Sequence, residues 1–159
     1  MKVRKVVAGS VLAAGLGVAG MMGAGTAQAA PGAAVSVSGV SVGIGDAKAS
    51  SSFGNAALAF NGGNAQTTGQ GVGNLAIANG ENSEARVVNG NFNIVAASGK
   101  DSEARVDNGS GNIVFAGSDS TSRVNGQGSL NSVTALCGGT STTAQPAQIK
   151  ASAPCVGVN

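Results

Sequence analysis

The feature that most constrains this chain is an asparagine that recurs every 19 residues. It stands at Asn55, Asn74, Asn93, Asn112 and Asn131. An apolar segment follows each asparagine, and a second, partly charged segment follows three of them at residues 83–87, 102–106 and 120–124. A fixed period of about 20 residues with two strand patterns per unit is typical of a solenoid, in which one repeat cannot bury a core until its neighbours stack on it.

The length of the repeat fits one turn of a β-solenoid. Two strands of about five residues and two turns of about four or five residues add up to one repeat. The turns carry Asn-Gly pairs, which readily adopt positive φ angles. The sequence therefore predicts an all-β fold: a β-solenoid (β-helix or β-roll) of about five 19-residue rungs, with two short strands per rung, over residues 54–136.

The second strand of each repeat alternates small or apolar residues with charged ones. Ala85, Val87 and their equivalents are expected to face the interior, as in a half-buried strand. The expected outward residues are Glu84, Glu103, Arg86, Arg105 and Arg123. A Glu column beside an Arg column allows diagonal ion pairs, and we interpret this face as solvated and structural. The alternative is a strip that binds anionic glycans through its arginines.

The asparagine column has two interpretations. Stacked amides inside the solenoid or at a strand–turn corner would bond to one another and to the turn backbone, which makes the column a structural ladder. The alternative is a row of surface amides that binds a ligand.

The first strand of each repeat is apolar on both sides. The second and fourth residues after the asparagine are small and apolar, as in Ala76 and Ala78. The first and third are also largely apolar, and they include Leu75, Ile77, Ile94, Ile113 and Phe115. A sheet that is apolar on both sides is expected to be covered on both sides or to be adhesive. We take this second set as the candidate interaction face, covered by the chain ends, a second copy or another surface; the sequence leaves its direction open.

Residues 1–29 have the pattern of a signal peptide. Lys2, Arg4 and Lys5 precede an uncharged, mostly apolar run, and residues 27–29 form a small-x-small cleavage site. We expect cleavage after Ala29 and a secreted, extracellular or cell-envelope location; the alternative is an uncleaved anchor. No later segment is apolar enough to span a bilayer. Three of the nine Lys and Arg residues lie in this segment, so residues 30–159 keep 6 basic and 7 acidic residues, a formal charge of −1.

The segments that flank the repeats are interpreted as caps. Residues 30–53 resemble a degenerate first rung, with strand patterns at 35–44 and 47–49. Beyond residue 136 the repeat pattern is lost, and residues 137–159 are expected to form a C-terminal cap or tail. The chain's two cysteines, Cys137 and Cys155, are expected to form a disulfide in an oxidising compartment. Closing that loop contributes on the order of 3 kcal/mol in the chain-entropy model. A redox or metal role is the alternative.

The composition argues against most chemistry. The chain has no histidine, and its seven carboxylates form no paired arrangement, so we expect no catalytic residues, no metal site, no cofactor and no enzymatic activity. The mature charge is near zero and no basic cluster is present, which gives no footprint for nucleic acid.

The repeats resemble two families. Residues 73–76 and 82–87 are similar to the strand–loop–strand units of curlins, the major subunits of bacterial curli amyloid fibres, over about residues 54–136. In this chain the glutamine columns of curlins are replaced by Asn or Ser, and the aromatic residues of curlins are missing. Residues 74–77 and 82–83 also resemble the head repeats of trimeric autotransporter adhesins, whose period is shorter.

These observations predict an exported, non-enzymatic β-solenoid with a structural or adhesive role at the bacterial surface or outside the cell. Its partner would be a second copy of itself, as a homo-oligomer or fibre, or a cell-surface component. One alternative is a self-assembling, amyloid-like fibre subunit, which the resemblance to curlins implies. The other is a soluble protein that binds a glycan or a small ligand.

Overall fold

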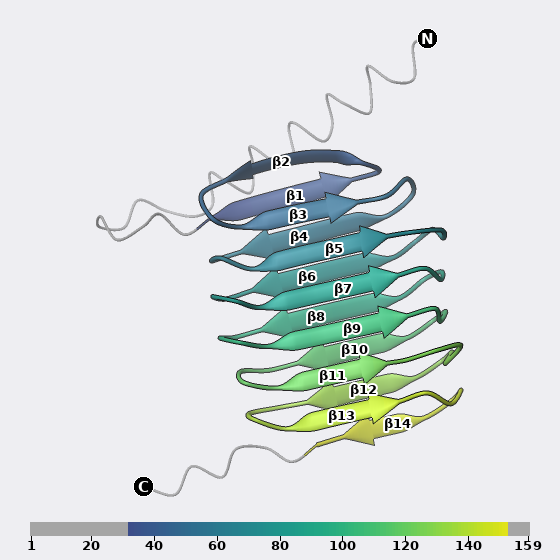
Figure 1. Cartoon of the computed structure of the whole chain (residues 1–159). Helices are drawn as coiled ribbons and strands as arrows, with labels where there is room; N and C mark the ends of the chain where they lie inside the picture. Colours follow the sequence, from purple (N-terminus) through teal and green to yellow (C-terminus); the bar gives the residue numbers. More distant parts are fainter. Residues whose placement is uncertain (1–31, 153–159) are drawn as a thin grey trace, which may run out of the picture.

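The computed structural model describes residues 32–152, and the regular structure in this range consists of strands. Figure 1 shows them stacked as successive turns of one coil. The strands are β1 (Ala33–Val37), β2 (Val40–Ile44), β3 (Lys48–Ser51), β4 (Ala56–Phe60), β5 (Asn64–Thr68), β6 (Leu75–Asn79), β7 (Glu84–Val88), β8 (Ile94–Ser98), β9 (Glu103–Asp107), β10 (Ile113–Ala116), β11 (Thr121–Val124), β12 (Ser132–Ala135), β13 (Thr140–Thr143) and β14 (Ile149–Ala151). The predicted all-β solenoid of about five turns, with two strands per turn, is confirmed.

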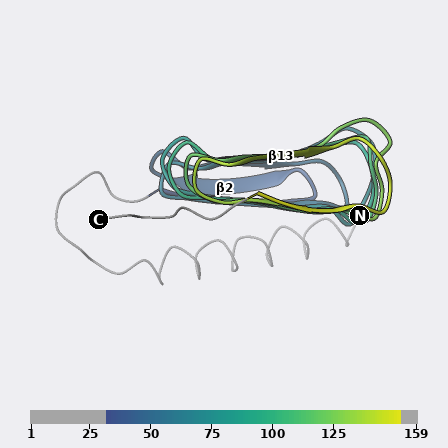
Figure 2. The ribbon, with the colours of Figure 1, turned by 90° about the horizontal axis from the view of Figure 1, so that it is seen from below.

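The strands form two sheets. Sheet A has the order β14-β12-β10-β8-β6-β4-β1-β2, and sheet B has the order β13-β11-β9-β7-β5-β3. From β3 and β4 onward every pair is parallel and in register, so that each residue lies beside its equivalent in the next turn. Viewed along the stack, the turns overlay as a flattened ring with one sheet along each long side (Figure 2).

The core between the sheets is thin and built from small side chains. Strands such as β6 and β7 alternate partly buried and fully buried residues along their length. Sheet A contributes the column Ala57, Ala76, Val95, Val114 and Val133, and each of these is at most 1% exposed. Sheet B contributes Val87, Val106 and Val124 opposite them, and these are equally buried. Valine is the largest apolar residue among the fully buried side chains, so the sheets can approach closely.

The N-terminal end differs from the predicted degenerate rung. β1 and β2 form an antiparallel hairpin, and β1 is also antiparallel to β4, so neither adds a regular parallel turn. Ala33 to Ser36 are all buried instead of alternating. β1 lies between β4 and β2 in sheet A and also contacts β3 of sheet B. Viewed along the stack, β2, the terminal strand of sheet A, lies over the space between the two sheets (Figure 2). The cap is therefore a hairpin plug, and β3 begins the regular coil of sheet B.

The C-terminal end also differs from the prediction. The repeat pattern is lost from the sequence after residue 136, but β13 continues sheet B and β14 continues sheet A. Ser141 and Thr143 take the inward positions that Ala and Val hold elsewhere, and both are buried. The solenoid therefore extends to residue 151. The predicted signal peptide and Cys155 lie outside the described residues, so the signal peptide and the Cys137–Cys155 disulfide stay predictions.

Candidate functional site

The asparagine ladder lies at the corner where the chain passes from sheet B to sheet A. The five residues are at most 5% exposed. In each step the Nδ2 of one asparagine donates to the Oδ1 of the preceding one, at 2.8–2.9 Å. The same Oδ1 accepts the backbone N–H of the later asparagine, at 2.9–3.0 Å. The second Nδ2 hydrogen of the first four donates to a glycine carbonyl of the next corner, at 2.7–2.9 Å.

The burial and bonding of the ladder favour its interpretation as structural. Its amide groups are bonded within the protein and covered by it, so they do not form a surface row for a ligand. The last Oδ1, that of Asn131, accepts the backbone N–H of Gln148 at 2.8 Å and so links the ladder to the start of β14. A serine column at the opposite corner was not foreseen from the sequence. Ser83, Ser102 and Ser120 are buried, and each hydroxyl donates to the carbonyl three residues earlier.

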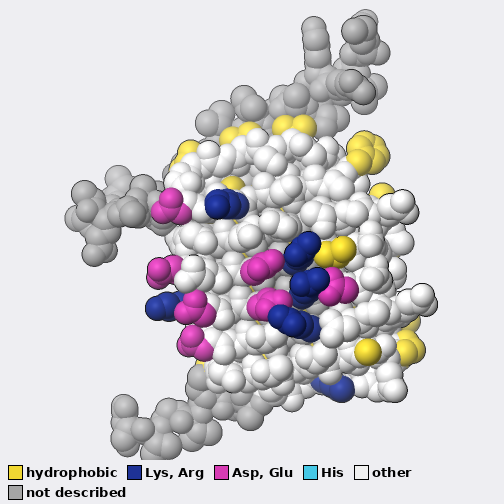
Figure 3. All heavy atoms as spheres, in the orientation of Figure 1, with side chains coloured by type: hydrophobic (Ala, Val, Ile, Leu, Met, Phe, Trp, Pro, Cys, Tyr) yellow, Lys and Arg dark blue, Asp and Glu magenta, His cyan; other side chains and the backbone are white. Residues whose placement is uncertain are grey.

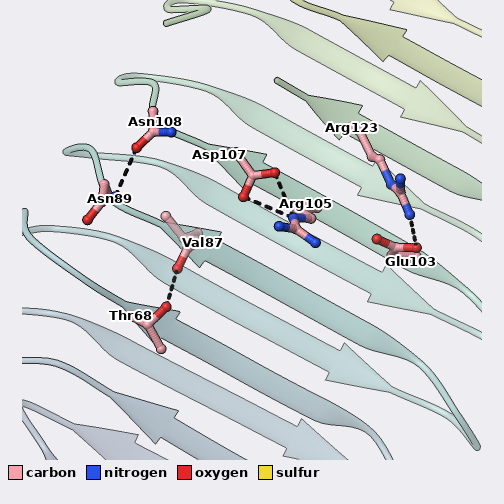
Figure 4. A network of polar contacts seen from close by, with 8 residues as sticks. All are labelled: Thr68, Val87, Asn89, Glu103, Arg105, Asp107, Asn108 and Arg123. Carbon is pink, nitrogen blue, oxygen red and sulfur yellow. Dashed lines mark hydrogen bonds and ion pairs between the residues drawn. The ribbon is translucent and has the colours of Figure 1, made fainter. Parts of the chain in front are cut away.

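The charged residues of sheet B face outward, as expected. In Figure 3 they gather on the middle of the face formed by β7, β9 and β11. Arg123 donates to the carboxylate of Glu103 in the preceding turn at 2.5 Å, which is the diagonal pairing that the sequence predicts. Arg105 pairs with Asp107 on its own strand at 2.7 Å (Figure 4).

These ion pairs leave little net charge for an anionic ligand. The hydrogen bond to Glu103 raises the pKa of the Arg123 guanidinium above its ordinary value, so Arg123 stays charged at any working pH. Arg86 is the remaining member of the predicted anionic-ligand strip; it is partly exposed on β7 and lies beside Arg105 in register. Three arginines with Glu84, Glu103 and Asp107 sum to zero formal charge on this face, which favours a solvated, structural role.

The apolar residues of the candidate interaction face point away from the core. Leu75, Ile94 and Ile113 form one stacked row, with Ile77 and Phe115 in the neighbouring row. Ile94 is 45% exposed and Ile113 is 55% exposed, while the other three are partly buried. The outward positions of β4, β6, β8, β10 and β12 carry no charged residue. Sheet A therefore presents a flat, uncharged and largely apolar surface to solvent, opposite the charged face of sheet B.

Sequence reasoning missed an apolar ridge beside this surface. At the position before the ladder asparagine, Gly54, Gly73 and Gly111 adopt positive φ angles of 68–74°. Phe92 and Leu130 occupy the same position with φ angles of 55° and 57°, and they are 70% and 73% exposed. Each lies against the glycine of the preceding turn. A bulky residue in the left-handed region is strained, so two of them in exposed corners are unusual. Aligning the repeats on asparagine would have revealed both.

The described residues offer little for chemistry or metal binding. Across residues 32–152, no group of three or more His, Cys, Asp or Glu residues could hold a metal ion. An open depression near the N-terminal end is lined by Asp46, Lys48 and Glu84 among others, without the nucleophile–base pair that acyl transfer needs. Within the same range, no helix has the length and apolar character needed to cross a membrane.

Comparisons with known proteins give no relative. No family model, no curated protein and no solved structure matches the chain. The resemblance to curlins and to trimeric autotransporter adhesins therefore stays a prediction, and the function has to be argued from the geometry alone.

Proposed function

We propose that this protein is an exported, non-enzymatic structural or adhesive protein that binds a flat, apolar partner surface at the cell envelope or outside the cell. The observation that carries the proposal is the uncharged outer face of sheet A. Parallel strands stacked in register make that face flat, and Ile94 and Ile113 expose about half of their surface on it. Apolar surface that is removed from water contributes about 25 cal/mol per Å², so a flat apolar partner gains from contact along the whole stack.

The ridge beside this face supports the same proposal. Phe92 and Leu130 stand where glycine would be unstrained, and both are largely exposed. Backbone strain clusters at binding sites, and within the fold these two exposed side chains pack against a glycine of the preceding turn. The ridge and the face lie next to each other, because residue 92 immediately precedes Asn93 and the strand β8.

The experiment compares the mature protein with the double variant Ile94→Thr, Ile113→Thr. Threonine keeps the β-branched shape but adds a hydroxyl, so the strands are preserved while the face becomes polar. We expect the variant to keep its circular dichroism spectrum and to lose most retention on an alkyl-agarose column. We also expect it to lose any concentration-dependent association seen by sedimentation.

A matched control changes the opposite face. The variant Glu84→Gln, Arg86→Gln removes one charge of each sign from the outward face of β7 and should bind the alkyl matrix as the unchanged protein does. If the two double variants are retained equally, or if the threonine variant binds as tightly as the parent, the apolar face is not the binding surface. Unfolding of the threonine variant would also contradict the assignment of these residues to the exterior.

Export and the disulfide form part of the proposal. An oxidising compartment would allow Cys137, at the turn after β12, to pair with Cys155 and tie the tail to the end of the coil. Mass spectrometry of the secreted protein should find an N-terminus at Ala30 and no thiol that alkylates before reduction. Two alkylated cysteines in untreated protein would remove the disulfide from the proposal.

A fibre subunit is the second candidate, and a specific feature favours it. The rungs are parallel and in register, and among the described residues β13 and β14 end the two sheets with unpaired edges, which are templates for pairing with another chain. A fibre in which these edges pair head-to-tail with the edge strands β2 and β3 of a second copy predicts filaments with a reflection near 4.8 Å from the unmodified mature protein. Protein that remains monomeric for days at high concentration would exclude it.

A further inference from the structure

The last described turn of the solenoid places a charged residue in a core column. β14 pairs with β12 in parallel, and the register sets Lys150 beside Val133. Val133 is fully buried and belongs to the inward column that begins with Ala57 and continues through Ala76, Val95 and Val114. Lys150 therefore takes the inward position of the next turn, where the preceding turns have alanine or valine.

The lysine side chain reaches from one sheet to the other. Its Nζ donates to the backbone carbonyl of Thr142 at 3.0 Å, and Thr142 belongs to β13, the last described strand of sheet B. β14 is the last described strand of sheet A. The contact therefore spans the end of the thin core; Lys150 is exposed there, and no strand follows β14 within residues 32–152.

We propose that Lys150 keeps the C-terminal end of the solenoid from associating with a second copy of this chain. The occupant that this end would otherwise accept is the C-terminal end of a second copy, because the edge strands β13 and β14 of the two copies carry the same inward columns, whereas the β1–β2 hairpin closes the opposite end. Any such association would bury the ammonium group between two apolar columns, away from water and without a carboxylate. Burial of an unpaired charge opposes contact far more strongly than one turn of alanine and valine favours it.

The two ends of the coil are thus protected by different means. At the N-terminal end the β1–β2 hairpin closes the core, with β1 largely buried and β2 facing solvent. At the C-terminal end the strands are short, and the inward charge of Lys150 prevents association instead. Inward-pointing charges and lysines on edge strands are known ways of preventing edge-to-edge pairing. The inference concerns the end of the coil and does not depend on what binds the outer face of sheet A.

The experiment is Lys150→Val in mature protein that also carries Ile94→Thr and Ile113→Thr, so that association through the outer face is suppressed. Valine extends the inward column without a charge. Sedimentation over a range of concentrations should give a weight-average mass roughly two-fold or more above that of the Lys150 parent, as expected for end-to-end contact between copies. Electron microscopy then distinguishes paired particles from filaments, and either form supports the inference.

Two controls make the result specific. Lys150→Arg keeps the charge and should remain monomeric like the parent. Lys48→Val removes a lysine from β3, the edge strand of sheet B at the other end, where the side chain lies beside the outward residue Asn64; it should also stay monomeric. The inference is overturned if Lys150→Val remains monomeric with an unchanged circular dichroism spectrum, if Lys48→Val associates to the same extent, or if the parent itself forms filaments.

Discussion

At the scale of single residues, the asparagine ladder is a continuous set of buried hydrogen bonds that joins one turn to the next. Asn112 donates to Asn93 and to a glycine carbonyl, and its Oδ1 accepts two N–H groups of Asn131. Truncation to alanine removes all four side-chain contacts and leaves buried groups without partners. Each such group costs about 1–3 kcal/mol, so Asn112→Ala should lower the free energy of unfolding by on the order of 3 kcal/mol.

The control for this variant lies on the surface of the same coil. Asn61 and Asn79 also form an amide contact between turns, at 2.7 Å, but in an exposed position. Asn79→Ala should change the free energy of unfolding by less than about 0.5 kcal/mol, because water replaces the lost partner. Urea titration followed by circular dichroism measures both. Equal losses for the two variants would mean that burial does not set the strength of the ladder.

The ridge residue Phe92 leads to the opposite expectation for stability. Its φ angle of 55° suits glycine, which the equivalent positions 54, 73 and 111 carry. Phe92→Gly relieves strain of about 1 kcal/mol and gives up a contact that is mostly exposed, so thermal stability should be unchanged or slightly higher. Retention on alkyl-agarose should fall at the same time. A large drop in melting temperature would show that Phe92 stabilises the corner and would remove it from the binding surface.

At the scale of strands and sheets, the sequence predicted the period of the repeat well but the direction of the strands poorly. An alternating strand pattern is the same whether the strand runs parallel or antiparallel to its neighbour, so residues 35–44 were indistinguishable from a degenerate rung. The buried run from Ala33 to Ser36 depends on tertiary position, because β1 is flanked by β2 and β4 and also contacts β3. Likewise, β13 and β14 lack the asparagine signal and are held by backbone pairing to the turns before them.

Which residues of sheet A face the core could not be predicted either, and the reason is different. Both sets of residues are apolar, so hydropathy alone does not choose between them. Side-chain volume decides which set faces the core. Sheet B contributes alanine, serine and valine, so the gap between the sheets is narrow and only equally small residues of sheet A fit into it. The larger Leu75, Ile94 and Ile113 are left outside. The candidate face was thus identifiable from the sequence, but its exposure was not.

At the scale of the whole molecule, the coil behaves as a stack of nearly interchangeable turns between two different ends. Each turn contacts mainly the turns before and after it, since the in-register pairing links every strand only to its neighbours in the sheet. The charge balance, the apolar outer face and the ladder are each repeated turn by turn. A property of the molecule that depends on the stack should therefore scale with the number of turns, while a property of the ends should not.

Removal of one complete repeat tests this description. Deleting residues 74–92 joins Gly73 to Asn93, so Asn93 takes the place of Asn74 in the ladder, β8 pairs with β4, and β9 pairs with β5. The inward side chains at the new contacts stay small, because Val95 replaces Ala76 beside Ala57 and Val106 replaces Val87 beside Thr67. We expect a folded protein with an unchanged β-type circular dichroism spectrum, a slightly smaller hydrodynamic radius and a modestly lower melting temperature. The matched control deletes residues 74–83, which removes β6 but leaves β7; this breaks the alternation between the two sheets, and the protein should lose its cooperative transition. If the whole-repeat deletion collapses to a random coil, the turns are not interchangeable units and the stability of this fold depends on contacts that reach beyond neighbouring turns.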